Sequence, residues 1–328
     1  MSGHTLDWSE TRTYKYAMPK TAENEAVPLA AREAAFMRDQ LRDILDVRTQ
    51  RPQAIAEAAA RRGRRAGLLG DDGQLFIIAA DHPARGALRV AEHPMAMADR
   101  AGLLERMSVA LGRPGVDGVL AAADIIEDLL LLGLLDDKVV IGSMNRGGLA
   151  GTAFEIDDRF TGYDAATIAR MNFDGGKMLF RIAPDDPATA QTMESCARAV
   201  SDLAVHGLIA MVEPFIAHRV DGRVRNDLSP EAVTRSIAVA AGLGTTSAYT
   251  WLKLPVVDDM EQVLAASTLP ALLLGGEVTA DTGAVFERWR KALRMPSVRG
   301  LVAGRTLLFP PDGDVAAAVD AAVSLVRG

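Results

Sequence analysis

The sequence predicts an α/β fold, namely a (β/α)8 TIM barrel preceded by an amino-terminal helical extension. The chain has 328 residues, a length that suits such a barrel with an extension. Hydrophobic residues make up 49% of it, which is enough for a large core. From Gln74 onward, eight short apolar runs alternate with amphipathic stretches, and eight strands close a parallel barrel. We therefore expect an extension over residues 1–70 and a barrel over residues 71–328.

The segment before Gly70 differs in composition from the rest of the chain. It is polar and irregular to about Lys20, and then rich in Ala, Arg and Glu at helical spacing through Ala66. The strands predicted after it are Leu75–Ala80, Gly118–Ala121, Val139–Gly142, Lys177–Ile182, Leu208–Glu213, Tyr249–Lys253, Ala271–Leu274 and Gly300–Val302. The predicted helices are Met95–Leu111, Pro187–His206, Pro230–Ala241, Asp258–Ala266, Asp281–Leu293 and Asp314–Val326, and several begin at Asp or Pro as helices prefer. The Gly-rich stretch Ser143–Tyr163 predicts a long loop after the third strand that could serve as a lid.

A doubly wound open sheet would show the same alternation of strands and helices. Its dinucleotide-binding pattern, G-x-G-x-x-G, is absent after the first strand, where Ala80-Asp81-His82-Pro83 stands instead. Polar residues also mark the carboxyl ends of several predicted strands, and a barrel collects its active site from many strand ends. These two observations favour the barrel.

Composition argues against several kinds of partner. The formal net charge is −7 and basic clusters are few, so we expect no nucleic-acid partner. The one basic run, Arg61-Arg62-Gly63-Arg64-Arg65, is expected on an exposed helical face. The amino terminus lacks a signal-peptide pattern, and the run Leu129–Leu135 is too short to span a membrane. Cys196 is the only cysteine, which excludes an intrachain disulfide and a multi-thiolate metal site. We therefore expect a cytoplasmic protein that acts on a small molecule.

Lys253 lies inside Thr250-Trp251-Leu252-Lys253-Leu254-Pro255, a short apolar segment predicted to be a buried strand. Burial removes hydration from the amine and favours its neutral, nucleophilic form, which a Schiff-base lysine requires. A lysine that snorkels from a strand end is the structural alternative. Three further ionisable residues lie at or near the ends of predicted strands, namely Asp81, Lys177 and Glu213.

The alternation of side chains along a strand predicts which residues share a face. Lys253 shares one with Trp251, and Lys177 shares one with Arg181. If these faces point inward, strands four, five and six place Lys177, Glu213 and Lys253 side by side, where charges are costly unless paired or catalytic. Lys253 would attack a substrate ketone, Glu213 would shuttle protons, and Lys177 would favour neutral Lys253 through like-charge repulsion while helping to hold the substrate. A purely structural Lys-Glu-Lys network is the alternative.

Six short motifs mark the predicted strand ends. They are Ala79-Ala80-Asp81-His82-Pro83-Ala84-Arg85-Gly86, Gly176-Lys177-Met178-Leu179, Met211-Val212-Glu213-Pro214, Trp251-Leu252-Lys253-Leu254-Pro255, Leu272-Leu273-Leu274-Gly275-Gly276 and Gly300-Leu301-Val302-Ala303-Gly304-Arg305. In this order the motifs resemble the class I (Schiff-base) aldolases of the deoxyribose-phosphate, tagatose-bisphosphate and archaeal-type fructose-bisphosphate aldolase group. Each motif alone is weak, but the ordered set from about Leu75 to Arg305 is fairly specific.

The resemblance implies that Lys253 is the Schiff-base residue, with Asp81, Lys177 and Glu213 as its catalytic neighbours. It also implies a phosphate site made by Gly275, Gly276, Gly304 and Arg305. Loops after strands seven and eight of a barrel offer backbone N–H groups to a phosphate, and Arg305 would add a bidentate contact. The resemblance implies no cofactor and no metal, and we expect a homo-oligomer.

The substrate is predicted through a finer resemblance, to an actinobacterial (β/α)8 subgroup associated with inositol catabolism. This resemblance implies 2-deoxy-5-keto-gluconate 6-phosphate, cleaved to dihydroxyacetone phosphate and malonic semialdehyde. Arg181 or Arg146 would then pair with the carboxylate of the acid sugar, and Arg85 and Trp251 are further expected substrate-binding residues. The chain departs from the tagatose-bisphosphate enzymes, which carry aromatic residues where Arg181 and Ile182 stand, and the extension has no counterpart in the group.

Other interpretations of the sequence stay open. A metal-dependent class II aldolase would need several His ligands, but the chain has five histidines and no closely spaced metal pair. His82 is instead expected to form a hydrogen bond beside Asp81. A transaldolase or a sulfosugar-phosphate aldolase would use the same lysine with another acceptor or tail group. A non-catalytic sugar-phosphate-binding barrel is the alternative outside enzymes, and the joint presence of the four ionisable residues argues against it.

Overall fold

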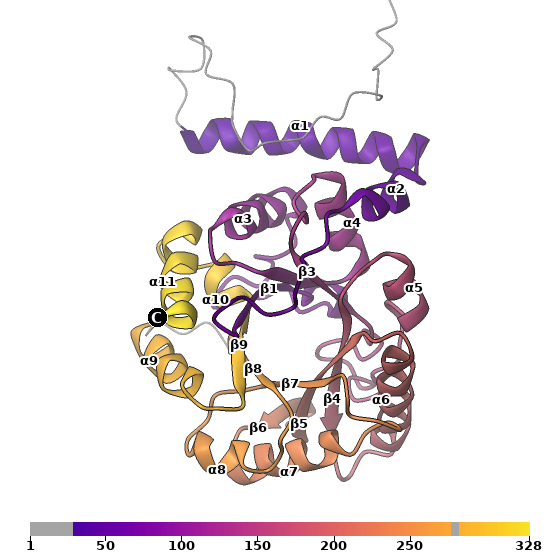
Figure 1. Ribbon diagram of the computed structural model, residues 1–328, viewed down its shortest axis with the longest axis vertical. Coiled ribbons are helices and arrows are strands. Elements are labelled where there is room, and N and C mark those ends of the chain that lie inside the picture. The colour runs from indigo at the N-terminus through magenta and orange to yellow at the C-terminus, as the bar shows by residue number, and fades with distance from the viewer. Residues whose placement is uncertain (1–28, 277–281) are drawn as a thin grey trace, which may run out of the picture.

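Eight parallel strands close into a barrel, which confirms the predicted fold class (Figure 1). The computed structural model describes residues 29–276 and 282–328. The barrel strands are β1 (Leu75–Ala80), β2 (Gly118–Ala121), β3 (Val139–Ser143), β4 (Gly175–Ile182), β5 (Ile209–Val220), β7 (Thr250–Leu254), β8 (Ala271–Leu274) and β9 (Val298–Ala303). They pair in this order, and β9 pairs with β1 to close the barrel. All eight pairings around the barrel are parallel.

Helices cover the outside of the barrel (Figure 1). They are α3 (Arg100–Gly112), α4 (Ala123–Leu131), α5 (Ala165–Arg170), α6 (Ala188–Val205), α7 (Pro230–Ala241), α8 (Met260–Leu264), α9 (Thr282–Leu293), α10 (Arg305–Leu308) and α11 (Val315–Arg327). Capping fixes several starts: the Asp99 side chain accepts from Ala101 N at 3.1 Å, and Ser229 caps α7 ahead of Pro230. The helix predicted from Met95 therefore begins later, while α4, α5 and α10 have no counterpart among the predicted helices. Asp281, the predicted start of α9, lies outside the described residues.

Strand β5 runs further than the sequence predicts. The predicted strand ends at Glu213, directly before Pro214, a residue that removes a hydrogen bond from a strand ladder. In the structure β5 continues through Pro214 to Val220 and pairs with antiparallel β6 (Arg223–Asp227). Strand β4 accompanies it as far as the pair Ile182 and Ile216. The two strands thus form an arm beyond the carboxyl end of the barrel, and the loop after β3 packs against this arm.

The inside of the barrel changes from apolar to charged along its axis. The apolar layer consists of Leu75, Ile77, Ala79, Leu120, Val139, Ile141, Ile209, Met211, Leu272 and Val302, with Leu68, Leu69 and Trp251 packed against it. Because successive side chains alternate between faces, the next inward positions toward the strand ends are Asp81, Glu213 and Lys253. The sequence pattern therefore places the ionisable residues directly above the apolar layer.

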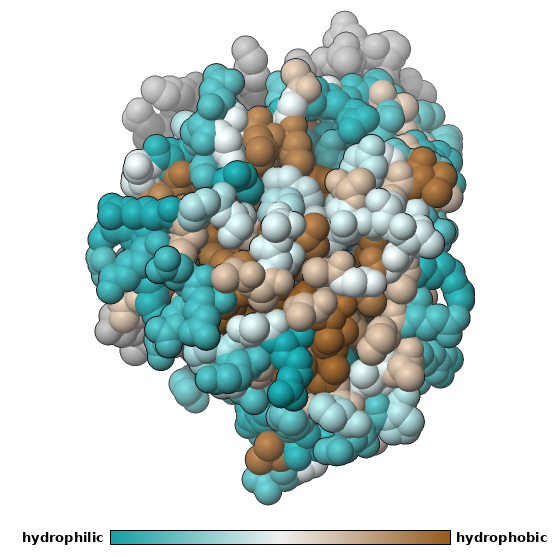
Figure 2. Space-filling model, turned by 60° about the horizontal axis from the view of Figure 1, so that its bottom comes forward, coloured by the Kyte–Doolittle hydropathy of each residue, from teal (hydrophilic) through white to brown (hydrophobic). Residues whose placement is uncertain are grey.

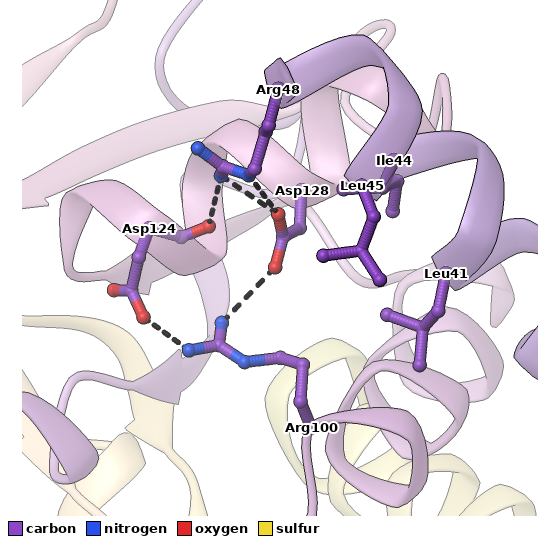
Figure 3. Close-up of a pocket in the computed structure, with 7 residues that line it drawn as sticks. All are labelled: Leu41, Ile44, Leu45, Arg48, Arg100, Asp124 and Asp128. Atoms are coloured by element: carbon purple, nitrogen blue, oxygen red, sulfur yellow. Dashed lines mark hydrogen bonds and ion pairs between the residues drawn. The ribbon is translucent and has the colours of Figure 1, made fainter.

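The amino-terminal extension forms α1 (Leu29–Gln50) and α2 (Ala54–Arg61). Helix α1 lies along the outside of the barrel beside α3, and α2 packs on α4 (Figure 1). Arg48 of α1 reaches Asp128 of α4, with a distance of 2.8 Å between Nη2 and Oδ1. Between these helices lies a cavity of about 350 Å³, shown in Figure 3, whose lining is Leu41, Ile44, Leu45, Arg48, Arg100, Asp124 and Asp128. Apolar contacts and partly exposed ion pairs together hold α1 in place.

The basic run after α2 does not form the exposed helical face that the sequence predicts. Helix α2 ends at Arg61, and the Arg62 side chain is buried, where it donates to Lys138 O at 2.7 Å. Arg64 Nη2 lies 3.0 Å from Asp174 Oδ1 at the start of β4. The run therefore fastens the extension to the amino-terminal end of the barrel, through acids that are distant in the sequence.

Asp117, which directly precedes β2, joins both ends of the barrel segment. One of its carboxylate oxygens pairs with Arg65, and the other pairs with Arg327 in the last turn of α11. The second oxygen also accepts from Phe76 N at 2.6 Å. This buried carboxylate thus links the segment before β1 to the last helix.

Within residues 29–276 and 282–328, no helix combines the length and the apolar character that crossing a membrane would need. Figure 2 shows one face of the molecule, where hydrophobic residues gather toward the middle and hydrophilic residues lie around them.

Candidate active site

Five charged side chains of alternating sign form a continuous chain inside the barrel, called here the charge chain. It runs from Arg146 through Asp81, Lys177 and Glu213 to Lys253. Lys253 Nζ lies 2.7 Å from Glu213 Oε1, and Lys177 Nζ contacts the other oxygen of Glu213. Lys177 Nζ also lies 3.0 Å from Asp81 Oδ2, which Arg146 Nη2 contacts as well. All five side chains are buried, so water does not screen their interactions.

The strand register explains why these residues meet. Strand β5 lies between β4 and β7, and Met211 of β5 pairs with Lys177 on one side and with Trp251 on the other. Two residues further along, Glu213 stands between the lysines of both neighbours. Asp81 follows β1 and reaches Lys177 from across the interior. The structure thus brings together the four predicted catalytic residues.

The two carboxylates of the charge chain are ionised despite their burial. Burial alone would raise the pKa of Asp81, but the charges of Arg146 and Lys177 outweigh it and hold this pKa well below its ordinary value. Burial likewise opposes the charge of Glu213, but Lys177 and Lys253 lower the pKa of Glu213 to about 2. Burial also lowers the pKa of Lys177, although Asp81 and Glu213 act in the opposite direction. Both acids are therefore ionised at neutral pH and can accept hydrogen bonds.

His82 does not form the hydrogen bond that was expected beside Asp81. The distance from His82 Nδ1 to Asp81 Oδ1 is 3.6 Å, and this nitrogen has no hydrogen-bond partner. Burial, the largest effect, lowers the pKa of His82 to about 3. The imidazole is therefore neutral at physiological pH.

The loop after β3, residues 144–164, is tied to β4. Asn145 Nδ2 donates to Leu179 O at 2.5 Å, and Leu179 N donates to Asn145 Oδ1 at 2.8 Å, so this side chain substitutes for a strand partner. A Cβ on Gly148 would lie 2.2 Å from Glu155 O, so only glycine fits there. These ties give the predicted lid a defined conformation against the barrel. Arg146 is aimed inward from it, and Arg146 Nε donates to Ser143 Oγ at 2.6 Å.

Two arginines that were expected to bind substrate hold this loop. Arg85 donates to Gly148 O and pairs with buried Asp158. Arg181 Nη1 lies 2.6 Å from Glu155 Oε1, and a second Arg181 nitrogen donates to the backbone oxygen of the same residue. Neither contact is with the charge chain. These pairs could not be predicted from periodicity, because the acids belong to an irregular loop.

The other expected substrate residues lie at two levels of the barrel. Trp251 packs against the apolar layer, so it lies below Lys253 and away from the carboxyl ends. At those ends Gly304, after β9, lies against β1, where a Cβ on it would be 2.2 Å from Ala79 O, and Gly275, after β8, lies against β9, where a Cβ on it would be 3.0 Å from Ala303 Cβ. Gly276 has a φ of +71°, and Arg305 begins α10. The four expected phosphate-binding residues therefore follow two neighbouring strands.

A metal centre finds no support in the part of the chain that the structure describes. No group of three or more His, Cys, Asp and Glu side chains is placed there to hold a metal ion. Cys196 is buried in α6, where burial raises the pKa of its thiol, as suits a packing residue.

Solved structures of aldolases share this fold. An archaeal fructose 1,6-bisphosphate aldolase is 20% identical, with a TM-score of 0.58 over 84% of this chain and 99% of that chain. The fructose-bisphosphate aldolase from Slackia heliotrinireducens is 16% identical, with a TM-score of 0.55 over 82% and 95%. No curated protein sequence matches the chain. At these identities the likeness concerns the fold alone.

A much higher identity connects the chain to a protein from Corynebacterium glutamicum. The crystal structure of Cgl0159 from that organism is 55% identical, with a TM-score of 0.86 over 88% of this chain and 97% of that chain. The model of the Cgl0159-like family matches residues 73–323, which span the whole barrel from before β1 into α11. The chain therefore belongs to the Cgl0159-like family.

Proposed function

We propose that the protein is a class I aldolase that cleaves a phosphorylated ketose through a Schiff base on Lys253. The observation that carries this proposal is the charge chain, with its two buried lysines on either side of Glu213. It lies at the carboxyl ends of the strands, where barrel enzymes have their active sites. Buried ionisable groups that serve only structure are costly, which favours a catalytic role.

The contacts suggest the proton transfers of this reaction. Lys253 Nζ adds to the ketone carbon, and the carbonyl oxygen takes up a proton to give a carbinolamine. Glu213 lies 2.7 Å from this nitrogen, close enough to accept the amine proton and to return it when water leaves. The iminium then accepts the electron pair of the bond between the α and β carbons, while the β-hydroxyl loses its proton and an aldehyde leaves. Protonation of the enamine and addition of water release the second product and free Lys253.

Lys253 is a better nucleophile than Lys177 by its contacts. Lys177 bridges two carboxylates, Asp81 and Glu213, whereas Lys253 contacts Glu213. Burial lowers the pKa of Lys177, but each carboxylate stabilises its protonated amine, so we propose Lys253, which has one such contact, as the nucleophile. Lys177 is then left to hold both acids in place and to polarise a substrate oxygen.

We place the substrate phosphate at Gly275, Gly276, Gly304 and Arg305. Gly275 N donates to Val302 O, so we propose that the backbone N–H groups of Gly276 and Gly304 bind the phosphate, which needs such donors. Arg305 would add a charged contact, and a guanidinium matches the geometry of phosphate. This placement puts the phosphate at one side of the charge chain and the reacting carbon near Lys253.

The finer proposal is that the substrate is 2-deoxy-5-keto-gluconate 6-phosphate, which yields dihydroxyacetone phosphate and malonic semialdehyde. Of the two arginines considered for its carboxylate, Arg181 is paired with Glu155. Arg146 lies on Asp81 inside the site and is the better placed of the two. A transaldolase or a sulfosugar-phosphate aldolase would use the same lysine, so product analysis with each substrate type separates these activities.

Trapping with borohydride tests the proposal. The protein is incubated with candidate ketose phosphates, reduced, digested and mapped by mass spectrometry, with Lys253→Met as the matched control. An adduct on the peptide that carries Lys253, absent from the control, is expected. A reproducible adduct on Lys177 would exchange the roles of the two lysines. No adduct with any ketose phosphate would favour a non-catalytic sugar-phosphate-binding barrel.

A further inference from the structure

We infer that Arg146 is a positioning residue that makes Lys253, rather than Lys177, the lysine that releases its proton. The inference rests on the proposed function and adds a residue whose effect passes through Asp81. Arg146 Nε is held by Ser143 Oγ at 2.6 Å, while its Nη2 contacts the Asp81 oxygen that also faces Lys177. The loop after β3, fixed by Asn145 on β4, holds the guanidinium in this position.

The charge chain has an excess of positive charge. The charge chain holds three cations and two carboxylates, so with all groups ionised it carries a net charge of +1. All five groups are buried, and an uncompensated buried charge is costly. Loss of one proton removes the excess. A guanidinium does not give up its proton in proteins, so the proton comes from one of the two lysines.

Burial lowers the pKa of Lys177 and its two carboxylate contacts act in the opposite direction, and we take the number of these contacts to decide which lysine it is. Deprotonation of Lys177 would weaken its contacts with both Asp81 and Glu213. Deprotonation of Lys253 weakens one contact, with Glu213 Oε1. Arg146 keeps its positive charge and compensates the negative charge of Asp81. The negative charge of Glu213, the remaining carboxylate, is therefore shared by Lys177 and Lys253. Without Arg146 the chain would hold two cations and two carboxylates, and neither lysine would gain from losing its proton.

The other charged groups around the site do not change this balance. His82 follows β1 and is neutral at physiological pH, since burial lowers its pKa to about 3. Arg85 and Arg181 are each paired with an acid of the loop, Asp158 and Glu155 respectively. Arg305, after β9, adds positive charge near His82, so it also favours the loss of a proton from one of the lysines.

Competitive labelling of the lysines measures this effect without a substrate. The folded protein receives a trace of acetic anhydride at a series of pH values, and mass spectrometry follows Lys253, Lys177 and the exposed Lys291 of α9 as an internal reference. The variants are Arg146→Gln, which keeps an N–H for Asp81 but removes the charge, and Arg146→Lys, which keeps the charge. Arg85→Gln is the control, because it loosens the same loop but leaves the charge chain intact.

In the wild type, Lys253 should reach half-maximal labelling at a lower pH than Lys177. Arg146→Gln should raise this pH for Lys253 by about one unit, a tenfold loss of neutral amine at a given pH, whereas Arg146→Lys should nearly restore it. An unchanged midpoint in Arg146→Gln, or an equal shift in Arg85→Gln, overturns the inference. So does earlier labelling of Lys177 in the wild type, a result that needs no variant to fold.

Two different measurements test the role of Arg146 and the proposed function. Reductive trapping of the wild type with dihydroxyacetone phosphate tests the Schiff base, whereas the labelling midpoints test the role of Arg146. Trapping on Lys253 together with an insensitive midpoint in Arg146→Gln would leave the aldolase proposal standing and remove Arg146 from it.

Discussion

Replacing Glu213 by Gln should make the stability of the protein less sensitive to acid. Glu213 is buried between Lys177 and Lys253. Burial alone would raise its pKa, but the two lysines lower that pKa from 4.5 to about 2. Because the pKa in the folded state lies below that in the unfolded state, the carboxylate stabilises the fold above about pH 4.5. This contribution is lost as the pH falls toward 2.

The structure gives the size of the effect. A pKa of about 2 instead of 4.5 corresponds to about 3 kcal/mol of stability at neutral pH. At a pH of about 3.5, roughly nine-tenths of the unfolded carboxyl groups are protonated while the folded group stays ionised, so on the order of 1 kcal/mol has been lost. Glutamine has the shape of a protonated glutamate and does not titrate, so the variant lacks this loss.

Urea unfolding at neutral pH and at a pH of about 3.5 measures the difference. The free energy of unfolding should fall by on the order of 1 kcal/mol more in the wild type than in Glu213→Gln. Glu194→Gln is the matched control, because Glu194 is exposed on α6 and pairs only with Arg198 one turn away. Equal losses of unfolding free energy in the wild type and in Glu213→Gln would show that the lysines do not lower the pKa of Glu213.

Further predictions concern the reaction itself. Lys253→Met should abolish cleavage and borohydride trapping while far-UV circular dichroism stays unchanged, because an unbranched apolar chain fills similar space. Activity should survive dialysis against EDTA, since the iminium accepts the developing charge, and a loss reversed by zinc would contradict the Schiff-base mechanism. Arg305→Ala should weaken the binding of phosphorylated substrates by roughly 1.5 to 3 kcal/mol, seen as a higher KM, and leave the binding of non-phosphorylated analogues unaffected. Arg181→Leu breaks the pair with Glu155, so it should lower turnover of neutral and acidic ketose phosphates equally, and a loss confined to acid sugars would restore a carboxylate-binding role.

The period-two pattern of strands made most of the barrel and its inner face predictable. Strand alternation alone decides which side chains share a face. Trp251 therefore shares a face with Lys253 in the structure as predicted, and Met211 shares one with Glu213. Strand order around the barrel then brings Lys177, Glu213 and Lys253 together. The predicted strand end at Glu213 was wrong, since pairing with β4 continues through Pro214 and overrides the local preference of proline.

The loop after β3 and the basic run could not be predicted in the same way. Arg85 and Arg181 find Asp158 and Glu155 in an irregular loop, where no periodicity indicates which side chains meet. The partner of Arg64, Asp174, is likewise distant in the sequence. Such pairs depend on the folded path of the chain, so sequence alone could name Arg146 as a candidate but not assign it to Asp81.

The carboxylate of Asp117 holds the two ends of the barrel segment close together. Arg65 and Arg327 meet on it, and a Cβ on Gly70 would lie 3.6 Å from Arg327 Nη1. The two ends of the barrel segment are therefore neighbours, as circular permutation requires. A short linker from the carboxyl end to Gly70, with a new opening in the exposed turn between β5 and β6, would preserve every strand pairing around the barrel. We therefore expect a chain permuted in this way to form the same barrel, because closure depends on which strands lie side by side.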